Sequence, residues 1–358
     1  MFEMKFKNFI FFTFILSFLS CRETLIQKPV PAFQRSGFFI VNEGRFQSGS
    51  GTIDFYDRVK DTVFHHIFQT KNDFPLGNIV QSVYSIGGRY IYVVVNNADK
   101  IEIVSQSDFE SLHTIENIHF PRYVLSDLNK LYVSAWDNTI KVFALQDSVH
   151  PELIKSIHTN TGPEKLLLWN HRLFVLNQGG FGIDSTISVI DTQTDTYLTT
   201  IAVAPKPTGA IIDRQNRLWV MCAGKGWEGI PHYDDTQGHL FCLDPLTFEI
   251  YHDYIFPEKD THPIGLAYNK YNNCLYFKYK NAIYQKNVET DSLGLKLFCN
   301  IQNVYSLFFD ERYRELLVSD PLDYVAKSKV FRVNQNGIII DSIQTGTVSG
   351  NFLINCTE

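Results

Sequence analysis

Short apolar segments recur along most of the chain, and within each one polar and apolar residues alternate with a period of two. One such segment is a short apolar strand of four residues. It occurs at residues 38–41, 90–93, 130–133, 172–175, 217–220, 274–277 and 315–318. From the second copy on, the spacing is 40 to 57 residues, close to the repeat length of a four-stranded propeller blade. The longest gap contains an insertion at residues 224–238.

A second apolar strand follows each copy after a turn rich in Gly, Asn or Asp. These strands are at residues 52–57, 100–104, 139–143, 186–191, 239–244, 282–284 and 329–333. No segment after residue 36 keeps a convincing helical period, so an all-β protein is predicted.

The two ends of the repeat array complement each other. The first copy lacks a preceding inner strand, whereas residues 350–355 form a strand without outer partners. Pairing the two would close a ring and remove its open edges. We therefore predict a seven-bladed β-propeller closed by pairing of the C-terminal strand into the first blade. Six or eight blades are the alternative, because the sixth copy is weak.

The N-terminus carries a targeting pattern. Lys5 and Lys7 precede an apolar run at residues 9–18, which is too short for a mature membrane-spanning helix. Ser20-Cys21 at its end resembles the lipobox of bacterial lipoproteins, in which the cysteine is lipidated. An ordinary secretory signal with a chance cysteine is the alternative.

These observations divide the chain into three parts. We expect a signal peptide at 1–20, a lipidated tether at 21–36 and the propeller at 37–358. The expected location is the outer membrane, with a lipid anchor and exposure at the cell surface. The periplasmic face stays open, because residues 22–24 contain a single acid.

Charge and cysteine usage exclude some functions. The formal net charge is −6 and no basic run is present, so a nucleic-acid partner is not expected. After Cys21, the cysteines are odd in number and lack CxxC or His spacing, which argues against a zinc site. At most two disulfides could form, and isolated thiols fit equally well.

The starts of the inner strands carry a further pattern, because each follows a proline-bearing turn. The prolines are Pro75, Pro121, Pro163, Pro207 and Pro263, and a fixed φ suits the start of a strand beside a crowded axis. With these turns, residues 37–355 resemble the YncE-like propellers.

The first blade carries a narrower resemblance. Residues 37–44, 49–57 and 75–78 resemble β-propeller surface lipoproteins of Bacteroidetes-type bacteria. Some of that group, the BtuG-type proteins, capture cobalamin for a TonB-dependent transporter.

Four loops are expected to gather on one face of the ring, around its central channel. They span residues 43–51, 177–185, 223–238 and 320–328, and long loops in a compact domain are often functional. Their aromatic, amide and charged residues suit a large, flat, partly polar ligand. The predicted ligand-binding residues are Arg45, Phe46, Gln47, Asn78, Tyr123, Trp136, Gln178, Phe181, Lys225, Trp227, His232, Tyr233 and Tyr324. Aromatics that merely cover the blade ends are the alternative, and for Tyr123 and Trp136 a plug in the core.

Metal binding and catalysis have weaker signals. A single histidine beside two carboxylates, as in His232, Asp234 and Asp235, is typical of a solvated loop, so no metal site is predicted. For a cobalamin ligand, the resemblance makes His232 and His262 candidates for axial coordination of cobalt. No nucleophile elbow or metalloprotease motif is present, so neither catalytic residues nor a cofactor are predicted.

We therefore expect a binding protein, not an enzyme. It would capture a small nutrient, cobalamin or another corrinoid by resemblance, and pass it to a TonB-dependent transporter. Two alternatives stay open. One is a scaffold that binds a protein or glycan, and the other is a periplasmic hydrolase or lactonase with calcium held by Asn78, Glu164 and His262.

Overall fold

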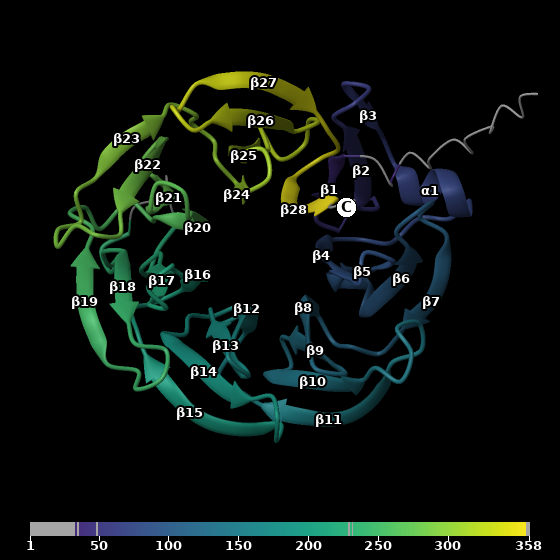
Figure 1. Ribbon diagram of the computed structural model, residues 1–358, viewed down its shortest axis with the longest axis horizontal. Coiled ribbons are helices and arrows are strands. Elements are labelled where there is room, and N and C mark those ends of the chain that lie inside the picture. Colours follow the sequence, from purple (N-terminus) through teal and green to yellow (C-terminus); the bar gives the residue numbers. More distant parts are fainter. Residues whose placement is uncertain (1–32, 34–35, 48, 228–229, 231, 356–358) are drawn as a thin grey trace, which may run out of the picture. The chain divides into compact units, whose positions relative to one another are not determined.

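The computed structural model describes residues 33, 36–47, 49–227, 230 and 232–355. These residues form seven antiparallel four-stranded sheets arranged around a central axis (Figure 1). The predicted signal peptide, Cys21, nearly all of the predicted tether and Cys356 lie outside the described residues. No helix among the described residues has the length and apolarity needed to cross a bilayer.

Each sheet is one blade, and its four strands follow one another in order from the central axis to the outer rim. The first blade is β28 (Ser349–Asn355), β1 (Gly37–Asn42), β2 (Thr52–Asp57) and β3 (Thr62–Phe64). The second is β4 (Val80–Ile86), β5 (Tyr90–Val95), β6 (Lys100–Ser105) and β7 (Ser111–Ile115). The third is β8 (Pro121–Asp127), β9 (Lys130–Ala135), β10 (Thr139–Ala144) and β11 (Glu152–His158). The fourth is β12 (Pro163–Trp169), β13 (Arg172–Asn177), β14 (Thr186–Asp191) and β15 (Thr196–Ala202).

The remaining blades repeat the same order. The fifth is β16 (Pro207–Ile212), β17 (Leu218–Cys222), β18 (His239–Leu243) and β19 (Ile250–Ile255). The sixth is β20 (Ile264–Asn269), β21 (Cys274–Tyr279), β22 (Ala282–Asn287) and β23 (Lys296–Cys299). The seventh is β24 (Ser306–Asp310), β25 (Glu315–Asp320), β26 (Lys329–Asn334) and β27 (Ile339–Gln344). The predicted seven-bladed architecture is confirmed.

The ring closes through the C-terminal strand, as predicted. β28 pairs antiparallel with β1, with Phe39 opposite Leu353 and Gly37 opposite Asn355. Phe38 and Phe352 meet edge to face at 6.3 Å, within a core cluster shared by the first and last blades. The pairing leaves β1 without an open edge and places both ends of the propeller in one blade.

The core lies between the blades. Buried strand residues point alternately to the two neighbouring blades, and the clusters that they form each join one blade to the next. Burial of both faces of a blade makes its middle strands nearly continuous apolar runs, as in β5 and β13, so the predicted alternation of polar and apolar residues is weak there. Cys222, Cys242, Cys274 and Cys299 are buried as free thiols.

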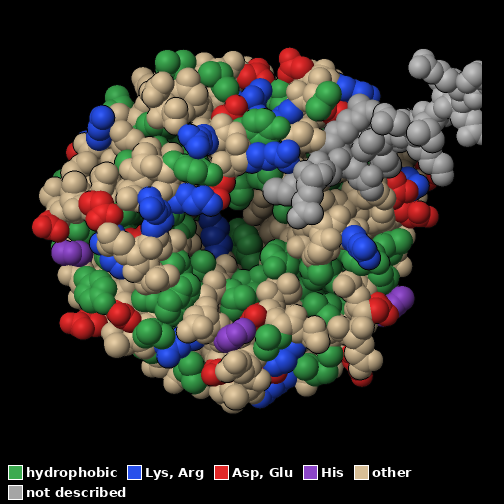
Figure 2. All heavy atoms as spheres, in the orientation of Figure 1, with side chains coloured by type: hydrophobic (Ala, Val, Ile, Leu, Met, Phe, Trp, Pro, Cys, Tyr) green, Lys and Arg blue, Asp and Glu red, His purple; other side chains and the backbone are tan. Residues whose placement is uncertain are grey.

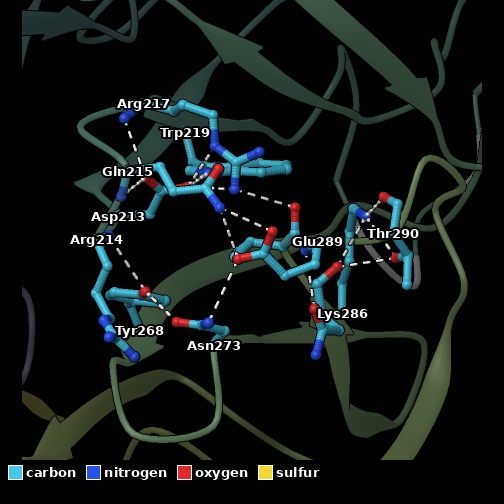
Figure 3. Close-up of polar contacts among 12 residues, drawn as sticks. Asp213, Arg214, Gln215, Arg217, Trp219, Tyr268, Asn273, Lys286, Glu289 and Thr290 are labelled. Atoms are coloured by element: carbon cyan, nitrogen blue, oxygen red, sulfur yellow. Dashed lines mark hydrogen bonds and ion pairs between the residues drawn. The ribbon is translucent and has the colours of Figure 1, made fainter.

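Polar networks add to the contact between blades, as between the fifth and sixth (Figure 3). Asp213, which follows β16, accepts hydrogen bonds from Trp219 Nε1 at 2.8 Å and Arg217 Nε at 2.7 Å. Gln215 in the same turn donates to the Glu289 carboxylate at 2.8 and 2.9 Å, across the blade boundary. The turn therefore fixes the position of one blade against the next.

Among the described residues, one α-helix and one 3₁₀ turn, η2 (Asn96–Ala98), depart from the all-strand expectation. α1 (Ile67–Asn72) lies between β3 and β4, and it buries Ile67 and Phe68 against the first blade. Six residues are fewer than two turns, too short for a helical period to show in the sequence.

Candidate functional site

The strand order places the four predicted loops at one end of the blades. In every blade, the loop after the second strand lies at the same end as the start of the inner strand. Backbone hydrogen bonds record this: Gln178 N to Gly162 O, and Ala223 N to Lys206 O, both at 2.9 Å. We call this end of the ring the loop face. Gly37, where β1 begins, lies at the opposite end.

The aromatic residues predicted in the loops are largely exposed. Their exposed fractions are 68% for Phe46, 84% for Phe181, 72% for Trp227, 86% for Tyr233 and 55% for Tyr324. Side chains exposed to this extent do not cover the blade ends. They are free to contact a ligand.

Trp136 and Phe181 form an aromatic cluster with Phe120. The Trp136 and Phe181 rings lie 5.1 Å apart, edge to face, and Phe120 lies 6.0 Å from Phe181. Arg122 stacks its guanidinium on Trp136 at 4.3 Å, a favourable cation–π arrangement. Trp136 is thus partly buried and supports the exposed Phe181. Its position lies between the two predicted roles, a ligand-binding residue and a plug in the core.

Asn78 holds the first loop in place. Its side-chain amide donates to Arg45 O at 2.9 Å and to Gly49 O at 2.8 Å. Its oxygen accepts from Gln47 N at 3.3 Å and from Asn97 Nδ2 at 2.9 Å. The amide is therefore used to position Arg45, Phe46 and Gln47.

Arg45 and Tyr324 connect the first loop with the last. Arg45 donates to Val325 O at 3.2 Å, and the Tyr324 ring lies 5.9 Å from that of Tyr305 at the start of β24. Gln178 begins the loop that carries Phe181 and is partly exposed. These residues lie on the loop face, as predicted.

The long insertion after β17 is held by charge pairs. Asp234 pairs with both Lys225 and His232, and Asp235 accepts the His232 backbone N–H at 2.8 Å. Lys206 donates to Gly226 O at 2.9 Å and lies 4.0 Å from the centre of the Trp227 ring. The polar side chains of the insertion thus position its exposed Trp227 and Tyr233.

His262 is not placed to coordinate a bound cobalt. It is 5% exposed and its Nδ1 lies 3.0 Å from Ala223 O. A Cβ at Gly226 would lie 2.6 Å from His262 Nε2, so the loop backbone covers the free nitrogen. Of the two predicted axial candidates, only His232 is exposed.

The predicted calcium ring of the lactonase alternative does not form. Glu164 pairs with Arg122, while Asn78 and His262 are engaged with the loops described above. In the part of the chain that the structure describes, no three His, Cys, Asp or Glu side chains are placed to hold a metal ion.

Sequence reasoning missed a cluster of charged residues at the channel mouth. Arg122 on β8 and Glu164 on β12 make two contacts of 2.9 Å, one from Nε and one from an η nitrogen. Tyr305 donates to the Glu43 carboxylate, with both oxygens 3.0 Å from its hydroxyl. We call Glu43, Arg122, Glu164 and Tyr305 the channel cluster.

Burial shifts the pKa values of groups in and beside the cluster. Burial raises the pKa of Glu43 to about 7, although Arg122 and the Tyr305 hydroxyl act against the shift. Burial also raises the pKa of Tyr305 and of the predicted residue Tyr123 well above the ordinary tyrosine value. The pKa of Lys165 is lowered for the same reason.

Part of this cluster had a sequence signal. Arg122 and Glu164 each follow the proline that opens an inner strand, Pro121 and Pro163. Residues at the same position in neighbouring inner strands lie at the same height along the channel. Their opposite charges could have suggested a pair.

The fold and the site define the class of protein: a seven-bladed β-propeller with an aromatic loop face above a charged channel. The chain belongs to the family described as "Domain of unknown function (DUF5074)", whose model matches residues 36–295. A search of the curated proteins gives no match.

Solved structures share the fold at low sequence identity. A quinonprotein alcohol dehydrogenase-like protein from Bacteroides thetaiotaomicron is 14% identical, with a TM-score of 0.66 over 90% of this chain and 79% of its own. The periplasmic gluconolactonase PpgL from Pseudomonas aeruginosa is 11% identical, with a TM-score of 0.67 over 90% and 99%. A protein from Lactobacillus plantarum is 12% identical, with a TM-score of 0.62 over 89% and 98%. At these identities the likeness concerns the fold alone.

Proposed function

We propose that this protein is a lipid-anchored binding protein of the outer membrane that captures a small nutrient on its loop face and delivers it to a TonB-dependent transporter. The observation that carries the proposal is the set of exposed aromatic side chains on that face, led by Phe181 and Trp227. Rigid aromatic side chains give contact area at a low cost in conformational entropy.

The path of the chain supports this arrangement. The first strand of the propeller begins at Gly37, on the end opposite the loops. The preceding segment therefore joins the propeller away from the loops, and the loop face is not its point of attachment.

Cobalamin is the first ligand to test, because the first blade resembles a group of surface lipoproteins whose BtuG-type members capture cobalamin. A corrinoid presents a flat macrocycle with amide side chains, which matches exposed rings flanked by Gln47 and Gln178. The channel cavity of about 220 Å³ is below the roughly 300–1,000 Å³ usual for ligand pockets. A corrinoid would therefore lie across the loops, with His232 as the exposed candidate for its cobalt.

Titration calorimetry with cyanocobalamin tests the proposal on residues 22–358, which lack the lipidated cysteine. We expect tight binding that weakens at least tenfold in Phe181→Ala and in Trp227→Ala, about 1.4 kcal/mol each. Leu198→Ala on the outer strand β15 is the control, since it removes an exposed apolar group (46%) far from the loops.

Each outcome has a clear reading. No heat at micromolar protein excludes cobalamin as the ligand. Binding that is unchanged in both loop variants places the ligand elsewhere and contradicts the role of the loop face.

A second candidate, hydrolysis of a small substrate in the channel, is favoured by one observation. Glu43 has a pKa near 7, which suits a group that exchanges protons at neutral pH. An enzyme of this kind would lose activity in Glu43→Gln, whereas cobalamin binding on the loops would not change.

A further inference from the structure

The inner strands enclose a cavity in the middle of the channel, below the channel cluster. Its volume is about 220 Å³. Figure 2 shows the hollow at the centre of the ring, with basic and apolar side chains at its edge. The residues used below are Tyr123, Lys165, Leu167, Phe308, Asn351 and Phe352.

Lys165 on β12 brings a positive charge to this cavity and has no matching partner there. Among the described residues, its ammonium makes no hydrogen bond or ion pair, and its favourable charge interaction is with Glu164. Glu164, however, is already engaged by two nitrogens of Arg122. The Lys165 side chain is half-buried, so its ammonium is an unpaired cation that solvent, and therefore a ligand, can reach through the channel.

A lysine that is buried elsewhere in the chain shows how such a group is satisfied by acceptors of the protein itself. Lys286 is fully buried beneath Trp219 and Tyr254. Its ammonium donates to Thr290 O at 2.9 Å and Ser292 O at 2.8 Å (Figure 3). Lys165 has no equivalent acceptors, so its cavity has room for an acceptor brought by a ligand.

The charges around the channel favour an anion. Arg122 and Lys165 are two cations, and Glu164 is the anion that pairs with Arg122. Glu43 is the remaining acid, and burial keeps much of it neutral at pH 7 and below. When Glu43 is protonated, the two cations therefore face a single anion, and the positive charge of Lys165 is not balanced.

The remaining walls are apolar with two polar groups. Leu167, Phe308 and Phe352 supply apolar surface, and Tyr123 and Asn351 supply a hydroxyl and an amide. A ligand that matches this lining has one negatively charged group and a small apolar body.

We propose that the central channel binds a small organic monoanion, a carboxylate with an apolar body, whose carboxylate pairs with Lys165 and whose body contacts Phe308 and Leu167. This site is separate from the loop face, and the proposal does not rest on cobalamin as the ligand. The two sites are distinguished by their variants.

The test uses benzoate and hexanoate as probes, each beside its neutral amide, in calorimetric titrations of residues 22–358. We expect at least one acid to bind tenfold or more tightly than its amide. Lys165→Met should abolish that preference, since methionine fills a similar volume without the charge. Lys165→Gln provides a second uncharged replacement that keeps a polar end.

Lys155→Met on the outer strand β11 is the matched control, because it removes an exposed lysine far from the channel. It should leave the preference unchanged, as should Phe181→Ala on the loop face. Equal binding of acid and amide by the unmodified protein, or a preference that survives in both Lys165 variants, would overturn the proposal. So would inorganic phosphate binding as tightly as the acids, because the apolar wall would then have no role.

Discussion

Glu43 makes the stability of this protein depend on pH in a direction opposite to that of most carboxylates. Burial raises its pKa from the ordinary value of 4.5 to about 7 in the folded protein. Between these two values the folded state holds a proton that the unfolded state has released. Stability is therefore fully present below about pH 4.5 and falls as pH rises through 7.

The magnitude follows from the same shift. Raising the pKa from 4.5 to about 7 corresponds to at most roughly 3.4 kcal/mol of stability lost by pH 8.5, at about 1.36 kcal/mol per unit. Arg122 and Tyr305 limit the loss because both stabilise the charged form, and Glu164 adds to it. Glu43→Gln removes the titration and keeps a side chain that resembles the neutral acid.

Urea unfolding of the two proteins between pH 5 and 8.5 measures this effect. Every other titrating group is shared, so its contribution cancels in the difference between them. We expect that difference to be near zero at pH 5 and to grow to roughly 2–3 kcal/mol in favour of Glu43→Gln at pH 8.5. A difference that stays flat over this range would refute the assignment of a neutral carboxyl to the channel mouth.

Two further predictions concern single contacts. Asp213→Ala should cost about 3–5 kcal/mol in urea unfolding, because it leaves Trp219 Nε1 and Arg217 without their buried acceptor; a loss no greater than that of Asp213→Asn would contradict this account. Gly162→Ala should weaken any ligand bound at Phe181, measured by calorimetry, since its Cβ would lie 1.9 Å from Gly180 N. Gly87→Ala is its control, with a similar positive φ but open space around it, and it should cost only about 1–2 kcal/mol of stability.

The fold could be predicted because its physical cause is local and repeated. Each blade buries both faces of its middle strands, so every copy shows the same short apolar pattern, such as Leu131-Tyr132-Val133 in β9. Ring closure was also visible, since the strand at 350–355 lacked partners at one end and the first copy lacked an inner strand at the other. α1 was missed because six residues do not establish a period.

The loop face could be predicted in part, whereas in the channel cluster only Arg122 and Glu164 had a sequence signal. A glycine-rich insertion that carries Phe181 or Trp227 marks itself by length and composition. Glu43, Arg122, Glu164 and Tyr305 come from four different blades, and they meet only because the ring brings the same end of its blades together around the channel. Glu164 shows the difficulty, since the sequence suggested a calcium ligand and the fold supplies Arg122 as its partner.

Arg122 connects the two sites, and this determines which variants can separate them. Its guanidinium stacks on Trp136, which contacts Phe181 on the loop face, and it also pairs with Glu164 next to Lys165 in the channel. A change at Arg122 or Trp136 would therefore disturb both the aromatic cluster and the charges of the channel. Phe181 and Lys165 lie at the two ends of this chain of contacts, so each can be altered while the pairing of Arg122 with Glu164 is kept. If the two sites are independent, Phe181→Ala weakens the binding of a corrinoid and leaves that of a small carboxylate unchanged. Lys165→Met has the reverse pattern.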